Sequence, residues 1–245
     1  MAFSEVHIHA LYGTDDGAGT KEEMFAMVDG AYADGSRLLC LTPHFHLGYF
    51  GDNRHSTQIA FRCLEEYVSE KYPDLQLILA NELRYSPECI SWLRDGLCRT
   101  FGNTDRVLVD FSENAEARVI EDGLNRLLNA GYTPVLAHVE RYRDLWGQRE
   151  KLRALHKKGI CFQMDTQSLL GGFGFRTKRA ADVVLTEGLV DFVGSDAHDL
   201  HRRPVGLGKA FRAIEKKYGS EYASAVCGTN AQRLLSVNTR KEQEQ

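Results

Sequence analysis

The sequence lacks any long apolar run. Its longest candidates, residues 37–41 and 75–80, fall far short of the roughly 20 apolar residues that cross a bilayer. The first ten residues, MAFSEVHIHA, also lack the basic start and the apolar stretch of a secretory signal. We therefore expect no membrane insertion, no export by that route, and a cytoplasmic protein.

The chain also lacks an excess of positive charge. Lys and Arg together number 30 against 34 for Asp and Glu, which gives a formal net charge of −4. Non-specific binding to nucleic acid depends on a basic surface that neutralises phosphates. This composition therefore predicts no nucleic-acid partner.

Paired cysteines are missing as well. The six cysteines, at positions 40, 63, 89, 98, 161 and 227, form no Cys-x-x-Cys pair. That spacing excludes a zinc knuckle and a thioredoxin-like redox site. We expect free thiols, buried or half-buried, in a reducing compartment.

No internal repeat, low-complexity block or linker rich in proline or serine divides the chain. It has 245 residues, of which 43% are hydrophobic, enough for one sizeable core. We predict one domain over residues 1–245, with a frayed polar tail over residues 236–245.

Short apolar runs alternate with longer amphipathic stretches along most of the chain. This alternation predicts βα units and a parallel α/β fold. The seven predicted strands span residues 5–8, 37–42, 76–80, 106–111, 133–137, 160–165 and 191–195. The predicted helices between them include residues 21–34, 57–71, 117–130, 148–158 and 178–187.

Ionisable side chains close six of the seven predicted strands. They are His7 and His9, His44, Glu82, Asp110, His138, and Asp196 with His198. In a barrel of parallel strands, the carboxyl ends converge on one rim, where such folds carry their chemistry. Histidines and carboxylates gathered there have the composition of a metal site.

Single motifs in this set are ambiguous alone. His7 and His9 lie on the same side of a strand, because side chains alternate with period two, yet a His-x-His pair is common without a metal. Asp15 and Asp16 could belong to a turn before the next helix. Thr20 with Glu23, however, forms a better helix start as a capping box, which leaves Asp16 for another role.

Together, the motifs HxH, DDGA, TPH, the Glu of LANE, HVERY and SDAH followed by RRP resemble the polymerase and histidinol phosphatase (PHP) superfamily. More narrowly, the chain is similar to the PHP-type protein tyrosine phosphatases of bacterial capsule and exopolysaccharide clusters. The resemblance runs from about residue 5 to residue 204 and weakly to 235. It implies a distorted (β/α)7 TIM-like barrel with the active site at the carboxyl ends of the strands.

The resemblance also implies three divalent metal ions. The first would be held by His7, His9, Glu82 and Asp196; the second by Glu82, Asp110 and His138; the third by Asp16, His44 and His198. The family usually has Glu at the position of Asp110, so the second ion would bind more weakly, sit displaced or be reached through water. Nitrogen and carboxylate ligands without thiolate suit manganese, iron or zinc, and the resemblance favours manganese.

In the implied mechanism, a metal-bound hydroxide attacks phosphorus while Arg141 and Arg203 grip the phosphate. His198 or a metal-held water would protonate the leaving oxygen. Arg143 and Arg202 are the neighbouring alternatives for the grip.

The remaining histidines miss the strand ends, so we interpret them as surface or loop residues: His46, His55, His156 and His201. The Gly-rich stretch over residues 171–174 lacks the Lys-Ser/Thr of a P-loop, which favours a flexible loop.

The resemblance therefore implies a metal-dependent protein tyrosine phosphatase that regulates capsule or exopolysaccharide synthesis. Its partner would be the tyrosine-rich tail of a membrane-associated bacterial tyrosine kinase. One alternative is a small-molecule phosphatase of the histidinol-phosphatase type, although those relatives usually carry His where this chain has Asp16. The other is a non-catalytic metal-binding regulator, for which Asp110 is the supporting feature.

Overall fold

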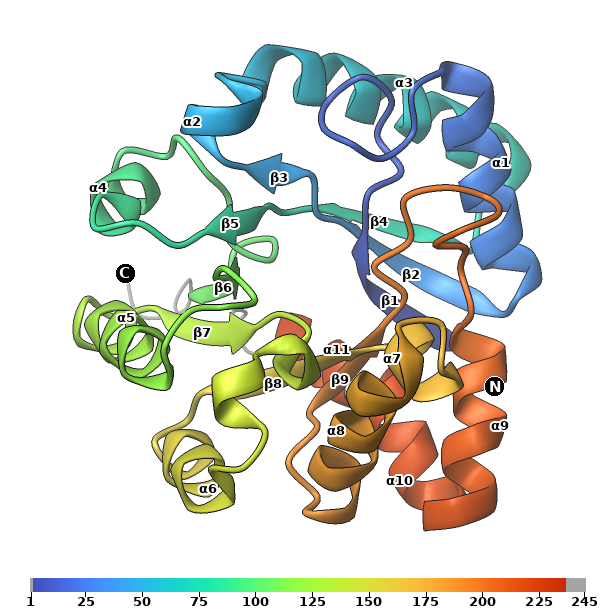
Figure 1. Cartoon of the computed structure of the whole chain (residues 1–245). Coiled ribbons are helices and arrows are strands. Elements are labelled where there is room, and N and C mark those ends of the chain that lie inside the picture. The colour runs from blue at the N-terminus through green and yellow to red at the C-terminus, as the bar shows by residue number, and fades with distance from the viewer. Residues whose placement is uncertain (1, 237–245) are drawn as a thin grey trace.

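Parallel strands form a curled ring at the centre of the molecule, and helices surround it (Figure 1). The computed structural model describes residues 2–236. The strands are β1 (Phe3–Ile8), β2 (Ser36–Leu41), β3 (His44–Phe45), β4 (Gln76–Leu79), β5 (Glu82–Arg84), β6 (Arg106–Asp110), β7 (Thr133–Leu136), β8 (Cys161–Asp165) and β9 (Phe192–Gly194).

The strands pair in chain order and the ring closes. β1 pairs with β2 and β2 with β4, while β3, β5, β6, β7, β8 and β9 follow one another, always in parallel. A parallel bridge between Ile8 and Ala197 returns the chain beyond β9 to β1, and the Asp196 N–H donates to the His7 carbonyl at 2.8 Å. The predicted distorted seven-stranded barrel is therefore confirmed.

Beyond two of the seven predicted strands, residues 37–42 and 76–80, the chain resumes as a second short strand that the sequence did not predict. Residues 42–43 separate β2 from β3, and residues 80–81 separate β4 from β5. Pro43 has no N–H for a ladder, but its carbonyl accepts from the Glu82 N–H at 3.2 Å and from the Asn81 side chain at 3.0 Å. The breaks let β3 and β5 begin with His44 and Glu82, which therefore stand at the rim.

Helices cover the outside of the ring (Figure 1). They are α1 (Lys21–Ala33), α2 (Leu47–Phe50), α3 (Arg54–Lys71), α4 (Cys89–Arg94), α5 (Ala117–Asn129), α6 (Arg149–Lys157), α7 (Thr166–Leu170), α8 (Gly174–Thr186), α9 (Leu207–Tyr218), α10 (Ser220–Ser224) and α11 (Asn230–Ser236), with the 3-10 turns η1 (Val139–Arg141) and η2 (Arg143–Leu145) and the π-helical turn η3 (Ala225–Thr229). No helix in residues 2–236 is both long and apolar enough to cross a membrane.

The five predicted helices are present, and the expected capping box starts the first of them. The Thr20 hydroxyl accepts from the Glu23 N–H at 3.2 Å, and the Glu23 carboxylate accepts from the Thr20 N–H at 3.1 Å. The core lies between the strands and helices such as α5, whose Ile120, Leu124 and Leu127 are all buried on one face. Of the predicted frayed tail, Ser236 ends α11 and the rest lies outside the described residues.

Candidate metal centre

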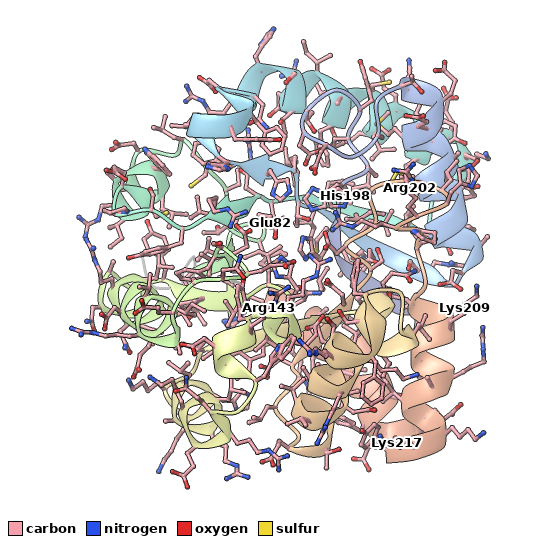
Figure 2. The ribbon with its side chains drawn as sticks, in the orientation of Figure 1. Glu82, Arg143, His198, Arg202, Lys209 and Lys217 are labelled. Atoms are coloured by element: carbon pink, nitrogen blue, oxygen red, sulfur yellow. The ribbon has the colours of Figure 1, made fainter. Side chains whose placement is uncertain are left out.

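All nine predicted ligands lie at or just beyond the carboxyl ends of the strands, on one rim of the barrel. Figure 2 labels two of them, Glu82 and His198. β1 supplies His7, and the loop that follows it supplies His9 and Asp16. β3 and β5 begin with their ligands, β6 ends with its own, and the turns after β7 and β9 carry the other three. The ligand atoms form three overlapping groups, each within 4.8 Å: His7, His9, Glu82 and Asp196; Glu82, Asp110 and His138; His9, Asp16, His44 and His198. The structure thus adds His9 to the third predicted group.

The first group converges on one point in the interior. The Nε2 atoms of His7 and His9 lie 3.1 Å apart, and both face Glu82 Oε2, at 3.3 and 3.2 Å. Asp196 Oδ1 lies 3.4 and 3.3 Å from the same two nitrogens. Two imidazole nitrogens and two carboxylate oxygens, all from buried side chains, form an arrangement that a cation fits.

The second and third groups extend from the first in two directions. Glu82 Oε1 lies 2.9 Å from His138 Nε2, and Asp110 Oδ1 is buried with no hydrogen-bond partner among the described residues. Asp16 Oδ1 lies 3.4 Å from His44 Nε2 and 3.3 Å from His198 Nε2. Because the Asp16 side chain is 54% exposed, the third group opens to solvent.

Backbone strain marks two of these positions. Among the non-glycine residues of the described chain, only His138 and Asp196 have positive φ, at 36° and 51°. Such conformations cost of order 1–3 kcal/mol each and persist where the surrounding structure imposes them, often at functional sites. Here the strain turns both side chains toward the rim directly after a strand.

The electrostatics of the site favour added positive charge. Burial alone would lower the pKa of His7, but the carboxylates of Glu82 and Asp196 raise it to about 9. Burial would raise the pKa of Glu82, yet His44 and His7 hold it well below its usual range. For Asp110, burial and then the Glu82 charge raise the pKa to about 7. A proton on His7 therefore helps to balance the carboxylates when no ion is bound.

A buried support behind the ligands was missed from the sequence. Asp15 Oδ2 lies 2.7 Å from His9 Nδ1 and also accepts from the His44 N–H at 2.9 Å. Gln163 Oε1 lies 3.1 Å from His7 Nδ1 and accepts from the His138 N–H at 2.8 Å. Such partners orient metal-binding imidazoles.

Two further buried residues near the ligands, Asp165 and Glu5, could have been found from the sequence. Asp165 ends the sixth predicted strand, the one to which no ligand was assigned, and it accepts from the Gln163 amide at 3.0 Å. Glu5 shares the period-two face of His7 and His9, and it accepts from the His7 and Ser195 N–H groups at 3.1 and 2.9 Å.

The DDGA loop packs against the first strand. The Ala18 N–H donates to the His9 carbonyl at 3.1 Å. A Cβ on Gly17 would meet that same oxygen at 2.0 Å, so only glycine allows the approach. The loop thereby brings Asp15 to His9, and Asp16 to His44 and His198.

A cavity of about 320 Å³ opens beside the three groups, and both predicted phosphate-gripping arginines line it. Arg141 Nη1 lies 3.2 Å from Asp196 Oδ2, and Arg203 also contacts that oxygen. The neighbouring alternatives Arg143 and Arg202 are exposed and do not line this cavity. The geometry therefore favours the predicted arginine in each pair.

The residues interpreted as outside the site belong to none of the three groups. His55 and His201 are exposed; His46 is half-buried and stacks on Tyr49, and His156 lies in α6 facing Asp191 rather than in a loop. Residues 171–173 form a turn between α7 and α8. All six cysteines are free thiols, four of them buried.

Comparisons with known proteins agree with this geometry. The family described as "Capsular polysaccharide synthesis, CpsB/CapC" matches residues 3–236. Tyrosine-protein phosphatase CpsB of Streptococcus agalactiae serotype III is 30% identical over 236 residues, covering 94% of this chain and 97% of the relative. Tyrosine-protein phosphatase YwqE of Bacillus subtilis is 29% identical, covering 96% and 92%.

Solved structures show the same fold. One comes from a study of YwqE from Bacillus subtilis and CpsB from Streptococcus pneumoniae, described as unique metal-dependent tyrosine phosphatases. It matches with a TM-score of 0.82 and 29% identity over 89% of each chain. A probable 2-pyrone-4,6-dicarboxylic acid hydrolase from Acinetobacter baumannii, at 14% identity over 96% of this chain and 99% of that one, shares only the fold, with a TM-score of 0.57. The chain belongs to the CpsB/CapC family of capsular polysaccharide synthesis.

Proposed function

We propose that this chain is a metal-dependent protein tyrosine phosphatase that regulates capsule or exopolysaccharide synthesis. The observation that carries the proposal is the convergence of three His and carboxylate groups beside a cavity lined by Arg141 and Arg203. The tyrosine phosphatases among its relatives support the substrate class. One family match across residues 3–236 supports a single domain.

The three groups would hold three divalent ions, most suitably manganese, with iron or zinc as alternatives. Every ligand is an imidazole or a carboxylate, and Glu82 belongs to two groups, so its two oxygens can serve two ions. When bound, the ions would neutralise the phosphoryl oxygens and lower the pKa of a coordinated water toward neutrality. Asp16, His44 and His198 form the most accessible group, because Asp16 is exposed.

Arg141 and Arg203 hold the phosphate in this proposal. Asp165 Oδ2 lies 3.1 Å from Arg141 Nε, and the Phe173 ring lies 4.3 Å from the Arg141 guanidinium carbon. These two contacts fix the guanidinium before substrate arrives. A planar guanidinium can make two parallel hydrogen bonds to a phosphate and stabilise its transition-state charge.

His198, or a water held by a metal ion, would donate a proton to the leaving oxygen of the substrate. The support is the place of His198 in the most accessible group, where its Nε2 lies 3.3 Å from the exposed Asp16 carboxylate. A phenolate, with a pKa near ~10, needs less of this help than an alkoxide does. Phosphotyrosine therefore suits a site that has a single histidine for this step.

We propose that the physiological substrate is the tyrosine-rich tail of a bacterial tyrosine kinase, met in the cytoplasm. The support is the resemblance in sequence together with the family's description as part of capsular polysaccharide synthesis. The cavity beside the metal site opens at the rim of the barrel, where an extended tail could present its tyrosines.

Phosphate release from a tyrosine phosphopeptide tests the proposed function. We expect turnover with manganese, none after treatment with a chelator, and much slower turnover of histidinol phosphate. Arg203→Gln should lower kcat/KM by about a hundredfold, in the range found for the loss of one transition-state donor, whereas the exposed neighbour Arg202→Gln should leave it unchanged.

The alternative functions give different results in the same assay. Turnover of histidinol phosphate without the peptide would mean a small-molecule phosphatase. Metal binding without hydrolysis of either ester would mean a non-catalytic regulator. Either result would overturn the proposal.

A further inference from the structure

A groove leads away from the metal site across the outer surface. A cavity of about 510 Å³ shares Glu113 and Arg141 with the cavity at the three metal groups. It continues into a third cavity of about 730 Å³, with which it shares Trp146, Phe175 and Arg176. The path crosses η2 and the first turns of α8, and Figure 2 shows Arg143 on the side of the site toward α8.

The groove is strongly basic although the whole chain is slightly acidic, with a formal net charge of −4. Four exposed arginines line the two outer cavities: Arg143, Arg149, Arg176 and Arg179. Arg149 pairs with Glu187, at 3.5 Å. The other three form no ion pair with any residue from 2 to 236, so their charges are available to a ligand.

Aromatic rings stand between these charges. Trp146 lines both outer cavities, and its indole N–H is fixed by the Glu140 carbonyl at 2.7 Å. Phe175 is 78% exposed, which is unusual for so large an apolar side chain. Guanidinium groups and aromatic faces at one surface are the composition of a peptide-binding site.

We propose that this arginine groove (Arg143, Arg149, Arg176 and Arg179, with Trp146 and Phe175) binds an acidic peptide segment that flanks the phosphotyrosine of the substrate. The inference rests on the proposed function, because the flanking segment is delivered by the phosphotyrosine itself. The shared Arg141 and Glu113 make the groove continuous with the catalytic cavity.

Glu113 sets where the acidic residues must lie. Glu113 lines both cavities, and its negative charge disfavours an acidic side chain next to the phosphotyrosine. The arginines without ion pairs line the cavities farther from the metal site than Glu113. We therefore expect the protein to prefer peptides with Asp or Glu two or more positions away from the phosphotyrosine.

A peptide fits these observations better than a membrane does. The arginines line a hollow that joins the catalytic cavity, so a peptide whose phosphotyrosine occupies that cavity would extend along them. A tethered segment also arrives at high effective concentration, so even weak exposed ion pairs raise its binding measurably.

The test compares two phosphotyrosine peptides that differ only in having Asp and Glu, or Asn and Gln, at the flanking positions. We expect the native protein to favour the acidic peptide by about tenfold in kcat/KM, mostly through KM, at low salt. Salt should shrink the preference. The double variant Arg176→Gln/Arg179→Gln should lose it, while hydrolysis of a small aryl phosphate stays unchanged.

A matched control removes the same charge elsewhere. The double variant Arg62→Gln/Arg118→Gln changes exposed arginines on α3 and α5 that line neither outer cavity, and it should keep the preference. Binding of a non-hydrolysable phosphonate analogue of each peptide, followed by fluorescence anisotropy, should give the same order of affinities.

Several results would overturn the inference. Equal turnover of both peptides by the native protein would show that the groove does not read acidic residues while leaving the proposed function intact. Turnover of neither peptide, with binding of neither phosphonate, would overturn the proposed function as well. Binding to vesicles of anionic phospholipid that depends on Arg176 and Arg179, without a peptide preference, would assign the groove to a lipid surface.

Discussion

Asp110 is the residue at which this chain departs from the pattern that it resembles. It is buried, its Oδ2 lies 3.2 Å from Arg84 Nη2, and its Oδ1 has no hydrogen-bond partner in the described chain. Replacing it with Glu adds one methylene beside an open cavity, so the carboxylate reaches further toward Glu82 and His138. We expect Asp110→Glu to lower the half-saturating metal concentration by on the order of tenfold, or ~1.4 kcal/mol.

The measurement is activity against free manganese concentration. Asp122→Glu on the exposed face of α5 makes the same chemical change far from the ligands and should leave the curve unmoved. A higher metal requirement for Asp110→Glu would show that the shorter side chain already fits the second group.

Gln163 positions two ligands without belonging to any of the three groups. Its amide oxygen lies 3.1 Å from His7 Nδ1 and accepts a hydrogen bond from the His138 N–H at 2.8 Å. Gln163→Leu keeps the size but removes the acceptor, and we expect metal affinity to fall about tenfold to a hundredfold. Excess manganese should restore most of kcat. A general loss of folding would instead lower kcat at every manganese concentration. An unchanged affinity would show that Gln163 does not orient the ligands.

Among individual residues, the proposed metal ligands could be predicted from the sequence, whereas most of the residues that hydrogen-bond to them could not. His7, His9 and Asp196 could be found because each ends a strand, and strand ends share one rim. Asp15 and Gln163 could not, because their role depends on contacts between segments far apart in the chain. Asp165 was the exception, since it also ends a predicted strand.

Gly123 sets how closely α5 approaches the ring of strands. A Cβ there would lie 2.8 Å from both the Phe111 and Tyr85 rings, which stack on each other. We expect Gly123→Ala to destabilise the protein by about 1–3 kcal/mol despite the helix propensity of Ala. Gly147→Ala, where a Cβ meets nothing within 4 Å, is the control for urea unfolding. Equal stability of the two variants would contradict this view of the packing.

An ion pair between α6 and the start of β9 makes stability depend on pH. The hydrogen bond to Asp191 raises the pKa of His156, against a smaller effect of burial. The pair is therefore fully stabilising below the unfolded pKa near ~6.5 and weakens as pH rises through the folded pKa. We expect His156→Ala to cost about 0.5–1 kcal/mol near pH 5.5 and less near pH 8.5, because both side chains are partly exposed.

Urea unfolding at the two pH values measures the difference, and the exposed His55→Ala is the control. The same cost at both pH values would show that the charge on His156 does not contribute.

The elements themselves were only partly predictable. Helices α1, α3, α5 and α6 follow clear periodic patterns, and the structure has them close to the expected bounds. α9 was missed because it begins after Gly206 with no side-chain cap to signal a start. The short strands β3 and β5 were missed too, since pairing resumed after Pro43 and Asn81 depends on the neighbouring strands rather than on local propensity.

For the whole molecule, metal binding should be coupled to stability and to proton release. With no ion bound, Glu82 and Asp196 raise the pKa of His7 to about 9, although burial opposes them. A metal ion binds the neutral imidazole, so metal affinity should rise between about pH 6 and pH 9 as His7 loses its proton. At a hundredfold excess over Kd, manganese should raise Tm by about 5–10 °C relative to chelator-treated protein, and more at the higher pH.

Thermal melts with manganese and with chelator, at about pH 6 and about pH 9, check this coupling. A metal-induced shift that shrinks as pH rises would contradict it, because the protonated histidines would then not be competing with the ions.

The most direct test of the central claim is anomalous diffraction at the manganese edge from crystals of the metal-loaded protein. We predict three peaks at the barrel rim: one among His7, His9, Glu82 and Asp196, one among Glu82, Asp110 and His138, and one among His9, Asp16, His44 and His198. A missing peak in any group would contradict the three-ion site. Manganese bound only elsewhere would contradict the assignment of this rim as the metal centre.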